Sequence, residues 1–207
     1  MNKDKFNIVG VITISRCLEF LNFIPDHIMK RNAAYNLQYL DFLNELNNSY
    51  DINRSIEKSF IKNQIMILGS LLECFTFSLL YSFSSNIDFG KEWKEMGSLK
   101  KYITLHDQKR IKTSVEELSK GELKRRSDFS WMINIAEKNK IFGKEYASVA
   151  HFVREHRNKI HLTSMKEPEY EYFTPEKLKE AQNCVKKFLE QLSGKTKEEI
   201  KNTFLFL

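Results

Sequence analysis

Four polar residues in the run Phe152-Val-Arg-Glu-His-Arg-Asn-Lys-Ile-His161 share one face of the helix that this run predicts. At about 100° per residue, Asn158 lies near +40°, His161 near −20° and Arg157 near −60° from Arg154. Two guanidinium groups, an amide and an imidazole therefore fall within an arc of about 100°. The apolar residues of a neighbouring face, which we expect to be buried, are Val149, Val153 and Ile160.

These side-chain types are sufficient for cleavage of RNA without a metal ion. A histidine with an ordinary pKa near 6.5 can take or give a proton at neutral pH, and a nearby guanidinium favours its neutral form. Arginine binds phosphate through two parallel hydrogen bonds and stabilises charge that develops on it. Asn158 can orient His161 or the substrate. The 2′-hydroxyl would attack the adjacent phosphate and the 5′-oxygen would leave, and a symmetric dimer would supply a second histidine.

The same spacing also has a purely structural interpretation. Arginine and histidine near the C-terminal end of a helix interact favourably with the helix dipole. Arg154 and Asn158 can equally be solvated, or paired with glutamates nearby. Spacing alone leaves both interpretations open.

The run also resembles the signature of the HEPN superfamily, in which an Arg is followed after four to six residues by a His, often with an Asn after an Arg. Arg154, Arg157, Asn158 and His161 carry this resemblance. The order of elements is similar too: a long apolar helix with the central acid Glu73, a shorter helix, the motif helix and a closing helix. The resemblance covers about residues 55–192.

This resemblance implies a dimeric helical bundle whose two motifs line a basic cleft. Catalytic members are metal-independent endoribonucleases of phage defence, toxin–antitoxin modules and RNA processing, whereas non-catalytic members bind RNA or act as assembly modules. We favour Arg154 and His161 as the motif pair, since six residues separate them, with Asn158 between them. Arg157, which only three residues separate from His161, is assigned an auxiliary role. Thr163 stands where some toxin members have a tyrosine.

Other residues extend or border this candidate site. His151 lies near +60° and is a second auxiliary candidate, whereas His156, near 200°, points away and is expected to pack or lie at the surface. The three histidines of this helix spread around it and cannot form one metal site, so we expect neither a metal nor a cofactor. Glu73 can pair with an arginine of the motif helix, or it can face a polar gap, as a buried glutamate does more often. Candidates for contacts with RNA phosphates are Lys124, Arg125, Arg126 and Lys159. Two roles are open for the aromatic residues of the loop after the motif: they can stack on RNA bases, or they can dock the loop on the body. These residues are Tyr170, Tyr172 and Phe173.

Composition places the chain among soluble globular proteins of moderate size. It has 207 residues, 42% of them hydrophobic and 29% charged, and its 7 Gly and 3 Pro argue against a many-stranded β fold. The net charge of +6 favours an anionic partner such as RNA, although lysine-rich surfaces are often only solvated. Cys17, Cys74 and Cys184 lack zinc-site spacing and indicate buried thiols in a reducing, cytoplasmic compartment.

The sequence predicts an all-α fold: one helical domain over 1–207, with a HEPN-like core at about 55–192, a helical hairpin appended at 1–50 and a short C-terminal tail helix. Helices are expected over 8–23, 32–46, 51–84, 127–140, 144–162, 174–192 and from 196 into the tail. Residues 85–97 are expected to connect helices, 99–120 to form a surface helix or a loop, and 163–173 to form a loop. The apolar end, 204–207, is expected to dock on the body or on another subunit. The apolar stretch 65–83 contains Glu73, which is costly in lipid, so we expect a core helix and no membrane partner.

Function is expected in one of three classes. The first is a metal-independent endoribonuclease of phage defence or a toxin–antitoxin system, acting as a homodimer on RNA, with a cognate antitoxin as a further partner. The alternative is a non-catalytic HEPN-like module for RNA binding, dimerisation or assembly. The third is an unrelated helical bundle in which the motif is a coincidence.

Overall fold

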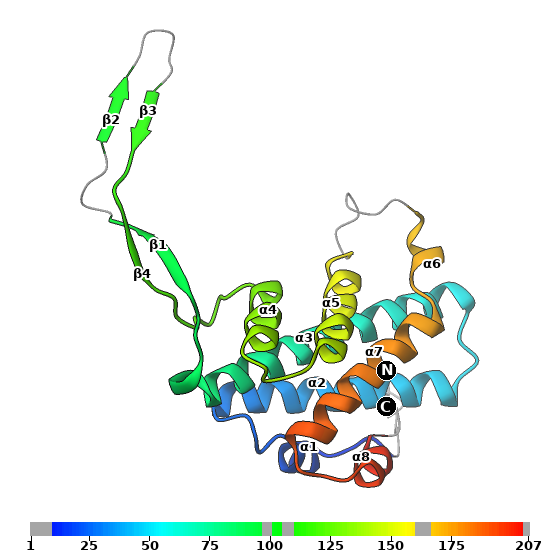
Figure 1. The fold of residues 1–207 in the computed structure, drawn as a ribbon. Helices are drawn as coiled ribbons and strands as arrows, with labels where there is room; N and C mark the ends of the chain where they lie inside the picture. The colour runs from blue at the N-terminus through cyan, green and yellow to red at the C-terminus, as the bar shows by residue number, and fades with distance from the viewer. Residues whose placement is uncertain (1–9, 97–100, 105–109, 160–166, 205–207) are drawn as a thin grey trace, which may run out of the picture.

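The computed structural model describes residues 10–96, 101–104, 110–159 and 167–204, which form a helical body with one projecting arm (Figure 1). The chain is mostly helical, as the scarcity of glycine and proline predicts. The helices are α1 (Ile14–Phe20), α2 (His27–Ser49), α3 (Arg54–Ser82), α4 (Phe129–Lys138), α5 (Lys144–Asn158), α6 (Glu169–Tyr172), α7 (Pro175–Leu192) and α8 (Lys197–Thr203), with a 3-10 turn, η1, at Ser84–Asn86.

The arm, residues 91–120, contains four short strands. Strand β1 (Lys91–Glu95) pairs antiparallel with β4 (Glu116–Lys120), and β2 (Lys101–Thr104) pairs antiparallel with β3 (Arg110–Thr113) further out. The prediction of a connector over 85–97 and of a surface helix or loop over 99–120 is therefore wrong in these described parts. No apolar stripe of helical period runs through this segment, so a helix would have had no face to bury.

Two glycines close the base of the arm. Gly90 has a φ of +75°, and its carbonyl accepts a hydrogen bond of 2.8 Å from the Gly121 amide. A Cβ added to Gly121 would lie 2.6 Å from the carbonyl oxygen of Phe89. Both positions therefore need glycine for the chain to leave and re-enter the body at one point. The Phe89 ring stacks on Trp131 of α4 and fixes this base to the body.

Helix α3 is the central element of the body, as its apolar circumference predicts. It packs against α2, α4, α5 and α7. Its hydroxyl groups bond within the helix: Thr76 Oγ1 donates to the Leu72 carbonyl at 2.8 Å and Ser78 Oγ donates to the Cys74 carbonyl at 2.9 Å. Its fully buried apolar residues include Ile65, Leu68, Leu72, Phe75 and Leu80.

Within the described ranges, α3 is also the one helix long and apolar enough to cross a membrane by length and composition. Half of its most apolar window is buried inside the protein. A core helix of a soluble protein has the same two properties, and the packing of α3 is that of a core helix.

The N-terminal elements belong to the same hydrophobic core as α3. Cys17 and Phe20 of α1 are buried in it, and the segment before α1 is tied to α2 by polar contacts. Asp41 accepts a hydrogen bond of 2.7 Å from the Ile12 amide, and Gln38 donates one of 2.9 Å to the Ile12 carbonyl. The predicted appended hairpin is thus packed into the core.

The tail end docks on the body, one of the two outcomes predicted for it. Phe204 is fully buried and packs edge-on against Phe20, with 5.0 Å between ring centroids. Residues 205–207 lie outside the described part of the chain.

Local capping signals place some helix ends correctly. Thr174 caps α7 with Pro175 in its first turn, and Thr196 and Glu199 form the predicted capping box of α8. Other boundaries differ from prediction. The cap of α2 is Asp26 rather than a residue near 32, the cap of α3 is Asn53 rather than Asp51, and α1 begins only after Thr13. Helices α4 and α5 end earlier than predicted, at Lys138 and Asn158, and the short α6 lies within the predicted 163–173 loop.

The three cysteines are free thiols. Cys17 and Cys184 are buried and Cys74 is partly buried. Burial raises the pKa of the Cys17 and Cys184 thiols to about 12 and that of Cys74 to about 11, so all three are protonated at neutral pH. They act as small apolar side chains, as predicted.

Candidate functional site

The buried face of α5 is rotated relative to the face that the sequence indicates. Its buried residues, spaced by three, are Ala147, Ala150, Val153 and His156. On the angular scale used above, Ala150 lies near −40° and Val153 near −100°, so Arg157 falls between them. Val149, predicted to be buried, is only partly so, and Ile160 lies outside the described residues.

Arg157 is held in the interface between α5 and α3. Its Nη1 lies 2.8 Å from Glu73 Oε2, so of the two arrangements considered for Glu73 the structure has the pairing with an arginine of the motif helix. A Cβ added to Gly69, one turn before Glu73, would lie 3.0 Å from both Cβ and Cδ of Arg157. Gly69 therefore makes room for the aliphatic part of Arg157, and Glu73 receives its charge.

Arg154 lies at the edge of the same face and is less firmly bound. Its side chain is 23% exposed, and its Nε is buried with no hydrogen-bond partner among the described residues. The guanidinium is 3.6 Å from Glu155 Oε1, a longer contact than that of Arg157 with Glu73. Since its contact with Glu155 is long, the exposed part of this guanidinium retains N–H groups that can bind an anion.

Asn158 and Lys159 end the described part of the motif. Asn158 is the last residue of α5 and is exposed, and Lys159 is the C-cap. The last three residues of the predicted helix, 160–162, lie outside the described residues. They include His161, and Thr163 lies outside as well. Arg154, Arg157 and Asn158 thus all lie in the last turns of α5.

His156 is part of a packed aromatic cluster, in agreement with the prediction that it points away from the motif face. Its ring lies between those of Phe152 and Tyr172, with centroid distances of 4.0 and 5.3 Å, and its Nδ1 is 2.8 Å from the Phe152 carbonyl oxygen. Lys177 Nζ lies 3.7 Å from the centroid of the Tyr172 ring. Tyr172 and the fully buried Phe173 thus dock α6 on the body rather than present free rings to a base.

Burial of His156 makes stability depend on pH. Desolvation lowers the pKa of its imidazole below the ordinary 6.5, so the unfolded chain gains a proton before the folded one as pH falls. Stability is then complete above about pH 6.5 and decreases as pH falls towards the lowered pKa. We expect His156→Phe, which keeps an aromatic ring in the stack, to reduce this decrease.

Urea unfolding at pH 7.5 and at pH 5.5 measures this effect. The matched control is His27→Phe, because His27 is exposed at the start of α2. If His156→Phe loses as much stability between pH 7.5 and pH 5.5 as wild type does, burial of His156 is not the cause of the pH dependence.

The remaining basic and auxiliary candidates lie in different places. His151 Nε2 is 3.2 Å from Asn134 Oδ1, so it connects α5 to α4. Lys124 Nζ lies 2.9 Å from Glu92 Oε1, and Arg125 pairs closely with Asp26. Arg126 is exposed. This run therefore carries ion pairs at the base of the arm, while remaining open to solvent.

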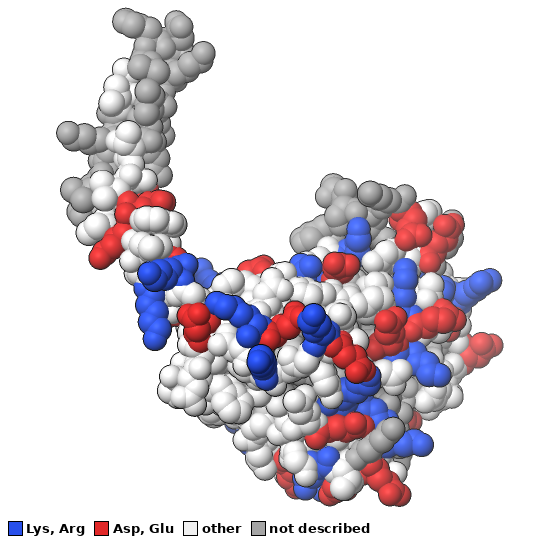
Figure 2. All heavy atoms as spheres, in the orientation of Figure 1, with Lys and Arg blue, Asp and Glu red and all other residues white. Residues whose placement is uncertain are grey.

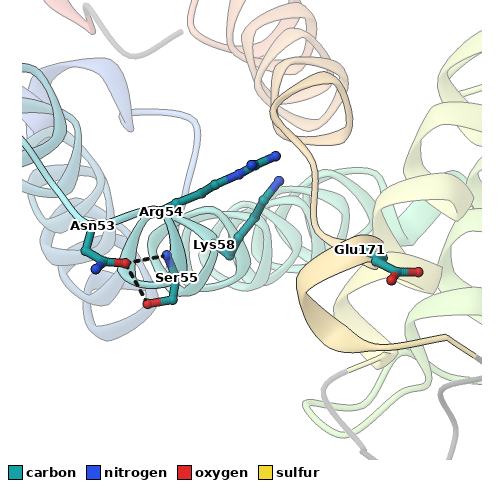
Figure 3. A pocket seen from close by; sticks show the side chains of 5 residues that line it. All are labelled: Asn53, Arg54, Ser55, Lys58 and Glu171. Carbon is teal, nitrogen blue, oxygen red and sulfur yellow. Dashed lines mark hydrogen bonds between the residues drawn. The ribbon is translucent and has the colours of Figure 1, made fainter.

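Of the hollows in the described part of the structure, two bear on α3 and its ion pair. The larger, about 700 Å³, lies at the N-terminal end of α3, where Arg54 and Lys58 extend side by side with Glu171 of α6 across from them (Figure 3). Its lining comes from α3 and α6 rather than from the motif helix. A smaller one, about 270 Å³, is lined by Glu73 together with Arg125, Ser70 and Cys74. Glu73 thus joins the motif helix to this second hollow.

In the described ranges, no group of three or more His, Cys, Asp or Glu side chains is arranged to hold a metal ion. No protein-family model, no curated protein and no solved structure matches the chain.

Proposed function

We propose that the chain is a metal-independent endoribonuclease of HEPN type, working in the cytoplasm in phage defence or in a toxin–antitoxin system. The observation that supports this most is the unequal state of the two arginines of α5. Arg157 is committed to Glu73, whereas Arg154 keeps a buried Nε without a partner among the described residues. This division favours Arg154 as the motif arginine, with six residues between it and His161.

The roles follow from the chemistry of each side chain. Arg154 binds the scissile phosphate and stabilises the charge that develops on its oxygens. His161 takes the proton of the 2′-hydroxyl, and the guanidinium nearby favours its neutral form. Asn158, exposed at the end of α5, orients the histidine or the substrate. A second copy of the chain supplies the second histidine for protonation of the leaving 5′-oxygen.

An RNA-cleavage assay in the presence of EDTA tests this proposal. We expect wild type to cleave RNA without divalent metal, and His161→Ala to lower the rate by at least about 100-fold, the effect of removing a general base. His27→Ala is the matched control, since His27 is exposed on α2. Cleavage that requires a divalent metal, or that is unchanged in His161→Ala, would overturn the mechanism. RNA binding without cleavage by wild type would favour the non-catalytic module.

A further inference from the structure

Three cations follow one another at four-residue spacing in the first turns of α3. They are Arg54, Lys58 and Lys62. Residues four apart are neighbours on a helix surface, and each step covers ~6 Å along the axis. Figure 3 shows that Arg54 and Lys58 extend in the same direction beside the hollow of about 700 Å³, with Glu171 across from them. We call these three residues the α3 cation row.

The inner end of the α3 cation row lies on the side of α3 that receives the motif helix. At about 100° per residue from Lys62, Gly69 lies near −20° and Glu73 near +20°. These are the two α3 residues that contact Arg157. Lys62 is itself anchored there, with its Nζ 5.9 Å from the centroid of the buried Phe173 ring. The row therefore runs from the contact between α3 and α5 to the hollow at the start of α3.

The two outer cations keep their donor groups available. Arg54 is exposed and Lys58 is partly buried, and neither forms an ion pair with a residue in the described ranges. A hydrogen bond from Thr174, and to a smaller extent the charge of Lys58, lowers the pKa of the Glu176 carboxyl at the start of α7. A guanidinium and an ammonium without a close carboxylate can donate their N–H groups to phosphate oxygens.

The distribution of charge over the body indicates which anion this row fits. Figure 2 shows Lys and Arg interspersed with Asp and Glu over the part of the body where α6 and α7 lie, so the described residues there form no broad basic area. A broad basic area would attract any polyanion. Single cations at steps of ~6 Å fit instead a chain of regularly spaced negative charges, such as the phosphates of one RNA strand.

We propose that the α3 cation row binds the backbone of single-stranded RNA on one side of the scissile phosphate. The strand runs from the end of α5 along Lys62 and Lys58 to Arg54 at the hollow. This inference rests on the proposed function for the identity of the ligand, and it adds the path that the strand takes. Because the contacts are to phosphates, they contribute affinity without sequence preference.

Binding of a single-stranded RNA of mixed sequence to the full chain carrying His161→Ala tests this path, since that change removes the proposed general base. Fluorescence anisotropy at several salt concentrations gives the affinity and its salt dependence. We expect Arg54→Gln/Lys58→Gln to weaken binding by at least about tenfold at low salt. The slope of log K against log salt should become shallower by about 1.4, ~0.7 for each phosphate contact on a single strand.

Two lysines at the opposite end of the motif helix provide a matched control. Lys140 and Lys144 are exposed and line another hollow, next to the start of α5. Lys140→Gln/Lys144→Gln removes the same charge and should change the affinity by no more than about twofold. Far-UV circular dichroism confirms that each variant is folded. Equal weakening by the two double variants, or unchanged binding after Arg54→Gln/Lys58→Gln, would overturn the proposal.

Cleavage by the chain that retains His161 separates this inference from the proposed function. There, Arg54→Gln/Lys58→Gln should raise the KM for RNA more than it lowers kcat, because the two cations lie away from the reacting atoms. RNA that binds through Arg54 and Lys58 but is not cleaved would leave this inference intact and overturn the proposed function. Cleavage with a KM that is independent of both residues would do the reverse, and a chain that binds no RNA would overturn both.

Discussion

Arg154→Ala is expected to lower the rate of RNA cleavage by about 10²–10³-fold, the usual effect of removing one group that stabilises transition-state charge. Its free energy of unfolding should stay within about 1 kcal/mol of wild type, since the change is at the edge of the buried face. The expected loss of rate follows because the guanidinium of Arg154 makes only a long contact, 3.6 Å, with Glu155 and so keeps N–H groups for a phosphate. Single-turnover cleavage in EDTA and urea unfolding measure the two quantities.

The matched comparison for Arg154 is a change of the ion pair beside it. Glu73→Met alone leaves Arg157 without its partner. It should lower the free energy of unfolding by about 1–3 kcal/mol, a value between those typical of exposed and of buried ion pairs. Glu73→Met/Arg157→Met, which replaces both charges by apolar side chains, should recover most of that loss and keep the cleavage rate near wild type. A cleavage defect in this double variant as large as that of Arg154→Ala would contradict the division of roles between the two arginines.

Gly69→Leu is expected to destabilise the fold by about 3 kcal/mol, through overpacking and through loss of the neighbouring ion pair. The side chain would enter the space that Arg157 occupies, since even a Cβ there lies 3.0 Å from Arg157 Cβ and Cδ. Urea unfolding of Gly69→Leu, Arg157→Ala and the double variant gives the coupling free energy. We expect the Arg157→Ala background to reduce the cost of Gly69→Leu by about 1–2 kcal/mol.

Ser70→Leu is the control for this second prediction. Ser70 follows Gly69 on the same helix but is exposed, so the change should alter the free energy of unfolding by no more than about 0.5 kcal/mol. Equal effects of the Gly69 and Ser70 substitutions, or no coupling between Gly69→Leu and Arg157→Ala, would show that close packing of α5 on α3 does not depend on Gly69.

Features set by neighbouring residues were predictable from sequence. The Thr174–Pro175 start of α7 and the Thr196–Glu199 box of α8 depend on hydrogen bonds within one helical turn, and both occur. The central α3 was predictable because its apolar residues cover most of its circumference. The pairing of Glu73 with an arginine of the motif helix was one of two arrangements that the sequence left open, the other being a polar gap.

Features that depend on contacts between distant segments were not predictable in the same way. The pairing of β1 with β4 joins residues more than twenty positions apart. Neither strand has an apolar stripe from which the pairing could be predicted. The rotation of α5 about its axis also depends on a residue far away in the sequence, since Gly69 of α3 lets Arg157 approach α3 closely. The buried face of α5 lies closer to Arg154 and Arg157 than a count of about 100° per residue from Val149, Val153 and Ile160 predicts.

The chemistry of the cleaved ends is the most direct test of a metal-free ribonuclease on α5. Attack by the 2′-hydroxyl with departure of the 5′-oxygen leaves a 2′,3′-cyclic phosphate on one RNA fragment and a 5′-hydroxyl on the other. We predict these ends from wild type in EDTA and their absence with His161→Ala. Fragments that end in 3′-hydroxyl and 5′-phosphate, or the same cyclic ends in equal amount from His161→Ala, would contradict the account.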